Sequence, residues 1–78
     1  MENSHNIVFG SRLKAARQNA RETQQSAADT FGISLRGYCR WEKGEREPNY
    51  SILIAIADHY GVTTDWLLGR TDAKLADE

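Results

Sequence analysis

Arginine and lysine side chains gather in the first half of this 78-residue chain, where they could bind a polyanion. Between Gly10 and Arg46 there are eight basic and four acidic residues, whereas from Glu47 onward there are two basic and six acidic residues. The net charge of −1 hides this polarity. A basic half joined to an acidic half is typical of a protein with a nucleic-acid face. The charge pattern therefore favours binding to a nucleic acid.

Other kinds of chemistry find little support in the residue types. The single cysteine, Cys39, cannot form an intramolecular disulfide, and no cysteine or histidine spacing suits zinc. His5 and His59 lie far apart in the sequence, so neither a metal nor another cofactor is expected. No nucleophile–base arrangement is visible, and a chain this short has little room for a deep substrate cavity. We therefore expect a binding module and not an enzyme, with Cys39 inert and not a redox switch.

The segment from Gln24 to Lys43 carries the most specific structural signal. It predicts two short helices, 24–31 and 35–43, which are joined by a link of only three residues. Gly32 in this link can adopt the positive φ that an abrupt turn requires. The small residue at the helix crossing and the apolar residues that fix its angle are Ala28, Phe31, Tyr38 and Trp41. These features together predict a helix-turn-helix.

Helical periodicity also runs through the rest of the chain, and strand signals are almost absent. Further helices are expected at 7–19, at 50–60 and in a short stretch around 66–68. The expected N-caps are Thr23, Ser34, Asn49 and Thr63. The expected core faces contain Phe9, Leu13, Ala16 and Ala20 in the first helix, Tyr38 and Trp41 in the third, and Leu53, Ile56, Ala57 and Tyr60 in the fourth. The pattern predicts an all-α, compact five-helix domain at 7–69, with a flexible N-terminus at 1–6 and a frayed, acidic tail at 70–78.

The ends and apolar runs of the chain bear on its location. The stretch Met1–Asn6 lacks the pattern of a secretory signal. The longest apolar run, Ile52–Ala57, is too short to span a bilayer. We therefore expect a soluble, cytoplasmic protein that does not associate with membranes.

A series of short motifs runs in order from about Phe9 to Leu68. They are Gly10-x-Arg12-Leu13-Lys14, Arg17, Thr23-Gln24-Gln25, Ala28, Phe31-Gly32-Ile33-Ser34, Arg40-Trp41-Glu42-Lys43-Gly44, Pro48, Ile56-Ala57 and Gly61-Val62-Thr63-Thr64-Asp65-Trp66-Leu67-Leu68. Each motif is degenerate, but the whole series at this spacing resembles the lambda repressor and Cro superfamily, also called the XRE family. The resemblance implies a lambda-repressor-like fold whose second and third helices form the helix-turn-helix. It also implies a sequence-specific regulator of transcription, a repressor, that binds double-stranded DNA.

The resemblance assigns roles to residues of the helix-turn-helix. It implies that the helix 35–43 lies in the major groove. The expected base-reading residues are Leu35, Arg36, Gly37 and Arg40, and the expected phosphate-binding residues are Thr23, Gln24, Lys43 and Arg46. Arg36 can offer a bidentate contact to a guanine, whereas Leu35 can only pack on a thymine methyl group. Without the motif, Lys43 and Arg46 would be interpreted as a solvated basic loop.

In similar proteins an arginine of the first helix meets the glutamate that ends the recognition helix. Arg17 and Glu42 are therefore expected to form a structural ion pair, the alternative being that both are exposed. Family members usually carry leucine where Glu22 and Ala27 stand, which makes packing around the second helix less predictable. Leu35 and Gly37 are unusual at reading positions, so the operator sequence cannot be inferred.

Two possibilities concern the partners of the chain. Because one recognition helix reads only a few base pairs, a homodimer is expected on an inverted repeat, with half-sites about 34 Å apart. Trp66 and Leu67 are its expected contacts, unless they belong to the core. The alternative function is an antitoxin or adaptor that binds a protein partner and touches DNA secondarily. The apolar residues proposed for that face are Ile52, Ile54 and Leu75.

Overall fold

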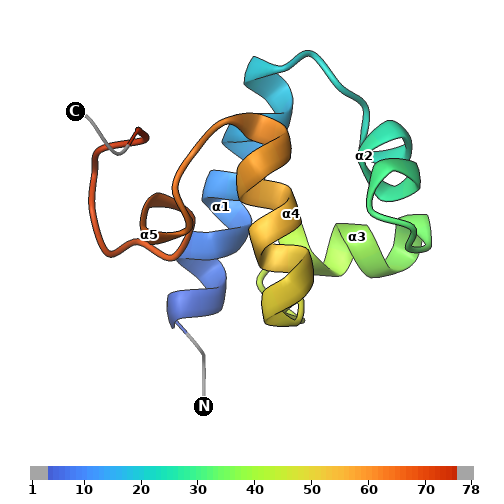
Figure 1. The fold of residues 1–78 in the computed structure, drawn as a ribbon. Coiled ribbons are helices and arrows are strands. Elements are labelled where there is room, and N and C mark those ends of the chain that lie inside the picture. Colours follow the sequence, from blue (N-terminus) through green and yellow to red (C-terminus); the bar gives the residue numbers. More distant parts are fainter. Residues whose placement is uncertain (1–3, 76–78) are drawn as a thin grey trace.

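The computed structural model describes residues 4–75, and within them it contains five α-helices and no strand (Figure 1). The helices are α1 (Ser4–Asn19), α2 (Gln24–Thr30), α3 (Leu35–Glu42), α4 (Tyr50–Tyr60) and α5 (Thr64–Leu67). α1 and α4 occupy the middle of the molecule, with α2 and α3 on one side and α5 on the other. This arrangement confirms the predicted all-α fold. None of the helices in residues 4–75 has the length and apolar character needed to cross a membrane.

Hydroxyl and amide side chains determine where four of the helices begin. Each of the predicted N-caps accepts a hydrogen bond from the backbone N–H three residues further on, at 2.9–3.0 Å. The pairs are Thr23 with Ser26, Ser34 with Gly37, Asn49 with Ile52, and Thr63 with Trp66. Such a cap satisfies an amide that has no partner inside the helix, and it stabilises a helix by about 1 kcal/mol. The four predicted caps are confirmed.

The apolar faces of all five helices meet in one core. Its buried residues are Phe9, Leu13, Ala16, Ala27, Ala28, Tyr38, Trp41, Ile56, Ala57, Trp66 and Leu67. Leu53 and Tyr60 pack against this core from α4 while keeping part of their surface exposed. The prediction for Ala20 is wrong, because this residue is exposed. α1 ends at Asn19, and the chain then turns away through Arg21, whose φ is +59°.

α1 and α3 approach each other closely because a glycine lies between them. A Cβ atom placed on Gly10 would lie 2.5 Å from the carbonyl oxygen of Glu42 and 2.6 Å from that of Trp41. These distances are too short for real atoms, so only glycine permits the observed spacing. The contact brings the C-terminal end of α3 against α1.

Residues near both ends of the described chain contact the rest of the domain. α1 begins at Ser4, and the loop after α3 packs on its first turns, where Gly44 lies beside Ile7. In the tail, the carbonyl of Lys74 accepts a hydrogen bond of 2.9 Å from the N–H of Thr63. Helix α1 thus starts three residues before the predicted helix at 7–19, and the segment after α5 contacts the domain through Lys74. Residues 1–3 and 76–78, which also belong to the expected flexible segments, lie outside the described residues.

Arg12 holds the tail against α1. Its guanidinium donates hydrogen bonds of 2.7 Å and 2.6 Å to the carbonyls of Trp66 and Thr71, and it pairs with the Asp72 carboxylate at 3.0 Å. Arg12 and Lys74 also lie over the Trp66 ring, at 5.1 Å and 5.3 Å from its centroid. These contacts explain why the segment beyond α5 stays on the domain, and they could not be predicted from its polar composition.

Candidate nucleic-acid interface

A tight turn sets the angle between α2 and α3. Gly32 has a φ of +68°, a left-handed conformation that other residues adopt at a cost, which agrees with the role predicted for it. The N–H of Ile33 donates to the carbonyl of Ala28 at 3.0 Å, and Ala28 is fully buried where the two helices meet. A larger side chain than the Ala28 methyl group would separate the helices. The helix-turn-helix geometry therefore follows from glycine, alanine and the Ser34 cap.

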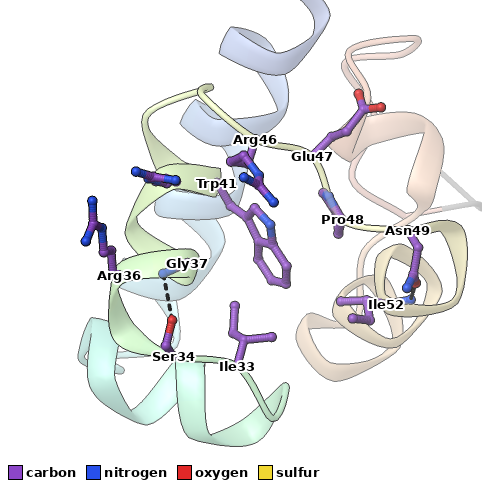
Figure 2. Close-up of a pocket in the computed structure, with 11 residues that line it drawn as sticks. Ile33, Ser34, Arg36, Gly37, Trp41, Arg46, Glu47, Pro48, Asn49 and Ile52 are labelled. Carbon is purple, nitrogen blue, oxygen red and sulfur yellow. Dashed lines mark hydrogen bonds between the residues drawn. The ribbon is translucent and has the colours of Figure 1, made fainter.

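One side of α3 faces solvent and carries cations. Arg36 and Leu35 are exposed, Leu35 to 41%, and Arg40 keeps 39% of its side chain exposed. Figure 2 shows Arg36 pointing away from the body of the domain. Gly37 lies between these residues and adds no side chain. Of the four expected base-reading residues on α3, Leu35 and Arg36 are thus exposed, and Gly37 and Arg40 are partly exposed.

A hollow of about 380 Å³ extends the outer side of α3 towards the start of α4 (Figure 2). Its apolar wall is made by Ile33, Trp41 and Ile52, and arginines 36, 40 and 46 line it as well. Ile52 is half-buried and lines this hollow. It is therefore only partly available to the exposed apolar surface that was expected for a protein partner. The hollow therefore combines three arginines with an apolar wall.

The remaining expected phosphate-binding residues differ in how free their side chains are. Lys43 and Arg46 are exposed on the loop that follows α3. The Thr23 hydroxyl is occupied as the cap of α2. Gln24 is half-buried, and its amide donates to Glu42 at 3.0 Å while its carbonyl oxygen accepts from the Cys39 thiol at 3.4 Å. The Gln24 side chain is therefore oriented by its neighbours, and it has less freedom to reach outward than the sequence suggested.

Glu42 is the centre of a buried polar network behind α3. The Arg17 guanidinium donates to it twice, at 2.7 Å and 3.2 Å, and the side chains of Arg17 and Glu42 are only 11% and 4% exposed. The Tyr38 hydroxyl donates to the same carboxylate at 2.5 Å. The Arg17–Glu42 pair was expected from the resemblance, whereas Tyr38 was assigned only to the core. Its spacing of four residues from Glu42 on one helix is a signal that could have identified the hydrogen bond.

The pKa values in this network follow from burial and hydrogen bonding. Burial raises the pKa of the Glu42 carboxyl, but hydrogen bonds from Arg17, Tyr38 and Gln24 outweigh this effect and bring the pKa below its ordinary value of 4.5. The hydrogen bond to Glu42 raises the pKa of Arg17. Burial, and then the hydrogen bond to Glu42, raise the pKa of Tyr38 well above 10. Glu42 is thus a buried anion whose charge is balanced by Arg17, and the network ties α3 to α1.

A second polar cluster was not predicted from the sequence. Glu22 accepts a hydrogen bond of 2.8 Å from the Tyr60 hydroxyl and pairs with His59 Nε2 at 2.8 Å. The edge of the His59 ring also meets the Phe31 ring, with centroids 5.5 Å apart. Burial raises the pKa of the Glu22 carboxyl, but the hydrogen bonds from His59 and Tyr60 lower it more, so the net shift is downward. These partners explain how a glutamate occupies a position where leucine is usual.

Trp66 and Leu67 do not form an outer surface. They are 6% and 0% exposed, and they belong to the core that α5 closes. Arg12 and Lys74 cover the Trp66 ring further. The expectation that these two residues contact a second copy is therefore replaced by the alternative that they are core residues. Any homodimer contact must involve other side chains.

No metal-ligand cluster is present among residues 4–75, where no three histidine, cysteine or acidic side chains come together. Cys39 is a free, half-buried thiol whose hydrogen bond is directed to Gln24.

Comparisons with known proteins agree with this geometry. A family model described as helix-turn-helix matches residues 13–67. The chain is 40% identical over 67 residues to a prophage-derived, uncharacterized HTH-type transcriptional regulator of Bacillus subtilis, YonR, covering 86% of this chain and 62% of the relative. It is 36% identical to the HTH-type transcriptional regulator ImmR of the same organism, covering 92% of this chain and 57% of that protein. It is also 41% identical to the cryptic phage CTXphi transcriptional repressor RstR of Vibrio cholerae, covering 76% and 53% of the two chains.

Among solved structures, the fold is similar to that of the SOS-response transcriptional repressor LexA from Eubacterium rectale. The TM-score is 0.81, the sequence identity is 22%, and the match covers 87% of this chain and 72% of that one. The match supports the fold. The chain spans only about three fifths of the length of the curated relatives.

Proposed function

Because the chain belongs to the helix-turn-helix family, in the XRE branch that resembles the lambda repressor and Cro, we propose that it is a sequence-specific DNA-binding regulator of transcription. It acts as a repressor, and α3 enters the major groove of double-stranded DNA. The relatives YonR and ImmR are named transcriptional regulators, and RstR is named a repressor. We expect no catalytic activity, and we expect the protein to work in the cytoplasm, where bacterial DNA lies.

The observation that carries the proposal is the exposed, cationic outer side of α3. An α-helix fits the width of the major groove, and its exposed side chains then meet base edges. Arg36 points outward from this side, and Arg40 follows it one turn later. Among residues 4–75, Arg36 stays exposed and Arg40 stays partly exposed. Because the Arg17–Glu42 pair and the close approach at Gly10 hold α3 against α1, α3 presents these side chains in a fixed orientation.

Different residues have different roles in this complex. Arg36 makes a bidentate contact with a guanine, which contributes about 1–3 kcal/mol of discrimination, and Arg40 reads an adjacent position. Leu35 packs on a thymine methyl group. Gly37 has no side chain, so the backbone of α3 can approach the bases closely.

The flanks of α3 hold the DNA backbone. Lys43 and Arg46 bind phosphates from the loop after α3, and their exposure leaves them free to do so. Thr23 and Gln24 bind a phosphate at the start of α2, where N–H groups point outward. Since the Thr23 hydroxyl and the Gln24 amide have partners within the domain, we assign this contact chiefly to backbone N–H groups. Phosphate contacts determine register and carry no sequence information.

The operator is proposed to be an inverted repeat that binds a homodimer. α3 has eight residues and is therefore about 12 Å long, which limits one copy to a few base pairs. Two copies on one face of the duplex, with their recognition helices about 34 Å apart, read enough sequence for specificity.

Selection of bound fragments from random DNA, followed by titration at two salt concentrations, tests this function. We expect a palindromic consensus and an affinity that falls as salt rises. Arg36→Ala should weaken binding to the consensus about tenfold to a hundredfold, because the guanine contact is lost, while binding to random DNA changes far less. Arg70→Ala is the matched control, since Arg70 is exposed beyond α5 and should leave both affinities unchanged.

Two results would contradict the proposal. The first is a selection that yields no consensus, and the second is an Arg36→Ala protein that binds the consensus as tightly as the wild type while its circular dichroism spectrum is unchanged.

A further inference from the structure

An acidic side chain, Glu45, lies among the cations assigned to DNA. It is exposed on the loop between α3 and α4, where it stands in the sequence between Lys43 and Arg46. Its carboxylate is 4.0 Å from Nε of Arg40, which is an ion-pair distance but too long for a hydrogen bond. A carboxylate repels DNA phosphates, so Glu45 does not belong to the phosphate-binding set. None of the roles proposed above uses it.

The backbone at the end of α3 determines where Glu45 lies. The cap residue Lys43 is followed by Gly44, whose φ of +76° is left-handed. The N–H of Glu45 then donates to the carbonyl of Arg40 at 2.9 Å, and the N–H of Gly44 donates to that of Trp41 at 3.1 Å. These two hydrogen bonds form a Schellman motif, in which apolar side chains commonly meet at the positions that Arg40 and Glu45 occupy here. The turn therefore keeps an ion pair where an apolar contact is usual.

The ion pair engages only one part of the Arg40 guanidinium. A guanidinium has five N–H donors in a planar fork, and Nε carries one of them. The other four are on the two terminal amino groups, which can offer the parallel donors that a bidentate contact with guanine O6 and N7 requires. The Arg40 side chain is 39% exposed. Glu45 can therefore hold the guanidinium at Nε while its terminal amino groups reach a base.

The charge of Glu45 also acts against a different use of Arg40. On DNA that offers no suitable base, an arginine can still bind a phosphate, and such contacts carry no sequence information. A carboxylate beside the guanidinium repels phosphate oxygens, whereas the edge of a base is uncharged. Because Glu45 is 57% exposed, its ion pair contributes little to the stability of the fold. Its effect should therefore appear in DNA binding.

We propose that Glu45 is a positioning residue that makes Arg40 specific for a base. It orients the guanidinium towards a base edge and disfavours its contact with phosphates. This role rests on the DNA-binding function proposed above, in which Arg40 reads a base.

The test repeats the selection from random DNA with Arg40→Ala and with Glu45→Gln, which keeps the shape of the side chain and removes its charge. Arg40→Ala should relax the preference at one base pair of each half-site. Glu45→Gln should relax the preference at the same base pair and leave the one due to Arg36 intact. The ratio of the affinities for the consensus and for random DNA should fall about threefold to fivefold, a factor typical of an exposed ion pair. In an Arg40→Ala background, Glu45→Gln should not change this ratio further.

Glu47→Gln is the matched control, because it removes the same charge from an exposed position of the same loop. Glu47 lines the basic hollow, but none of the ion pairs among residues 4–75 includes it. The control should raise both affinities by the same factor, so that the ratio and the consensus stay unchanged. Glu45→Gln should fold, because the position is exposed and the backbone hydrogen bonds of the turn are retained. Circular dichroism checks this.

The outcomes separate this role from the proposed function. If Glu45→Gln leaves every base preference intact, or if Glu47→Gln lowers the ratio equally, Glu45 acts only as a charge and the proposed role is wrong. If Arg40→Ala relaxes no base pair, Arg40 does not read a base and the role is also wrong. In each of these cases a wild-type consensus still supports the DNA-binding function. If the wild type yields no consensus, that function fails and the role of Glu45 fails with it.

Discussion

Glu42 shows how a single side chain connects stability to the orientation of the recognition helix. Its carboxylate accepts hydrogen bonds from Arg17 on α1, Gln24 on α2 and Tyr38 on α3 itself. A buried anion with three donors is stable only while all of them are in place. The network therefore resists any tilt of α3 away from α1 and α2.

Replacing Glu42 by alanine should strongly destabilise the domain at neutral pH. The change leaves the Arg17 guanidinium buried without its counter-charge, and such a loss costs about 3–5 kcal/mol. Urea unfolding monitored by tryptophan fluorescence measures this loss of unfolding free energy. Because a small domain can unfold altogether at this cost, Glu42→Gln, which keeps the shape and part of the hydrogen bonding, is the milder companion variant.

The same variants give a prediction for pH. Since the folded-state pKa of Glu42 is below 4.5, the carboxylate stabilises the fold fully above the unfolded value, and this contribution is lost as pH falls through the folded pKa. The gap in unfolding free energy between wild type and Glu42→Gln should therefore narrow below about pH 4.5. Glu45→Ala, at an exposed carboxylate 4.0 Å from Arg40, should stay within about 0.5 kcal/mol of wild type throughout. A gap that stays constant down to pH 3 would contradict the assigned role.

Much of this network could not be predicted from the residues alone. The pairing of Arg17 with Glu42 follows from the resemblance to similar proteins and not from the spacing of the residues. The Glu22–His59–Tyr60 cluster joins residues more than thirty positions apart, and no periodicity or cap connects them. Long-range polar contacts depend on how the helices pack, and a sequence pattern reports mainly which face of each helix is apolar.

Helix starts, in contrast, were predictable because they depend on local chemistry. Thr23, Ser34, Asn49 and Thr63 each satisfy an amide three residues away, whatever the rest of the chain does. The error at Ala20 has the opposite cause. The apolar spacing continued past the end of α1, but the chain turned away at Arg21, so the periodic position no longer faced the core.

The spacing between α1 and α3 yields a prediction at Gly10. Alanine is the better helix former by about 1 kcal/mol, so an exposed helical position would gain stability from the change. At Gly10 the added methyl group would lie 2.5 Å from a backbone oxygen of Glu42, and overpacking of this kind costs about 1–3 kcal/mol. We expect Gly10→Ala to lower the midpoint of thermal unfolding and to weaken operator binding, because α3 is displaced.

Ser11→Ala is the control for this change, since it alters the neighbouring, exposed position of the same helix. It should shift the stability by no more than about 0.5 kcal/mol. An unchanged or higher unfolding midpoint for Gly10→Ala would show that the helices can separate without loss, and that the close approach has no structural role.

At the scale of the whole molecule, the uneven distribution of charge along the sequence places exposed cations on α3 and on the loop after it. The basic first half contains α3 and the loop after it, where Arg36, Lys43 and Arg46 are exposed. The acidic second half contributes α4, α5 and the tail. Exposed cations on one side of a protein attract DNA at long range. The net charge near zero therefore conceals a molecule with one face suited to phosphate.

The packing of the tail leads to a last prediction, because it links residues at opposite ends of the chain. Arg12 on α1 donates to the carbonyls of Trp66 and Thr71, and its side chain is only 22% exposed. Hydrogen bonds from a charged donor contribute about 1.5–3 kcal/mol, so Arg12→Ala should destabilise the domain by about that amount. It should also release the tail, so that the Thr63 amide, which donates to Lys74, exchanges its hydrogen faster.

Asp72→Ala removes only a fully exposed partner of Arg12 and should leave the exchange of Thr63 unchanged. If Arg12→Ala protects the Thr63 amide as well as the wild type does, the tail is held by the Trp66 ring and the backbone hydrogen bond alone, and the domain boundary then does not depend on Arg12.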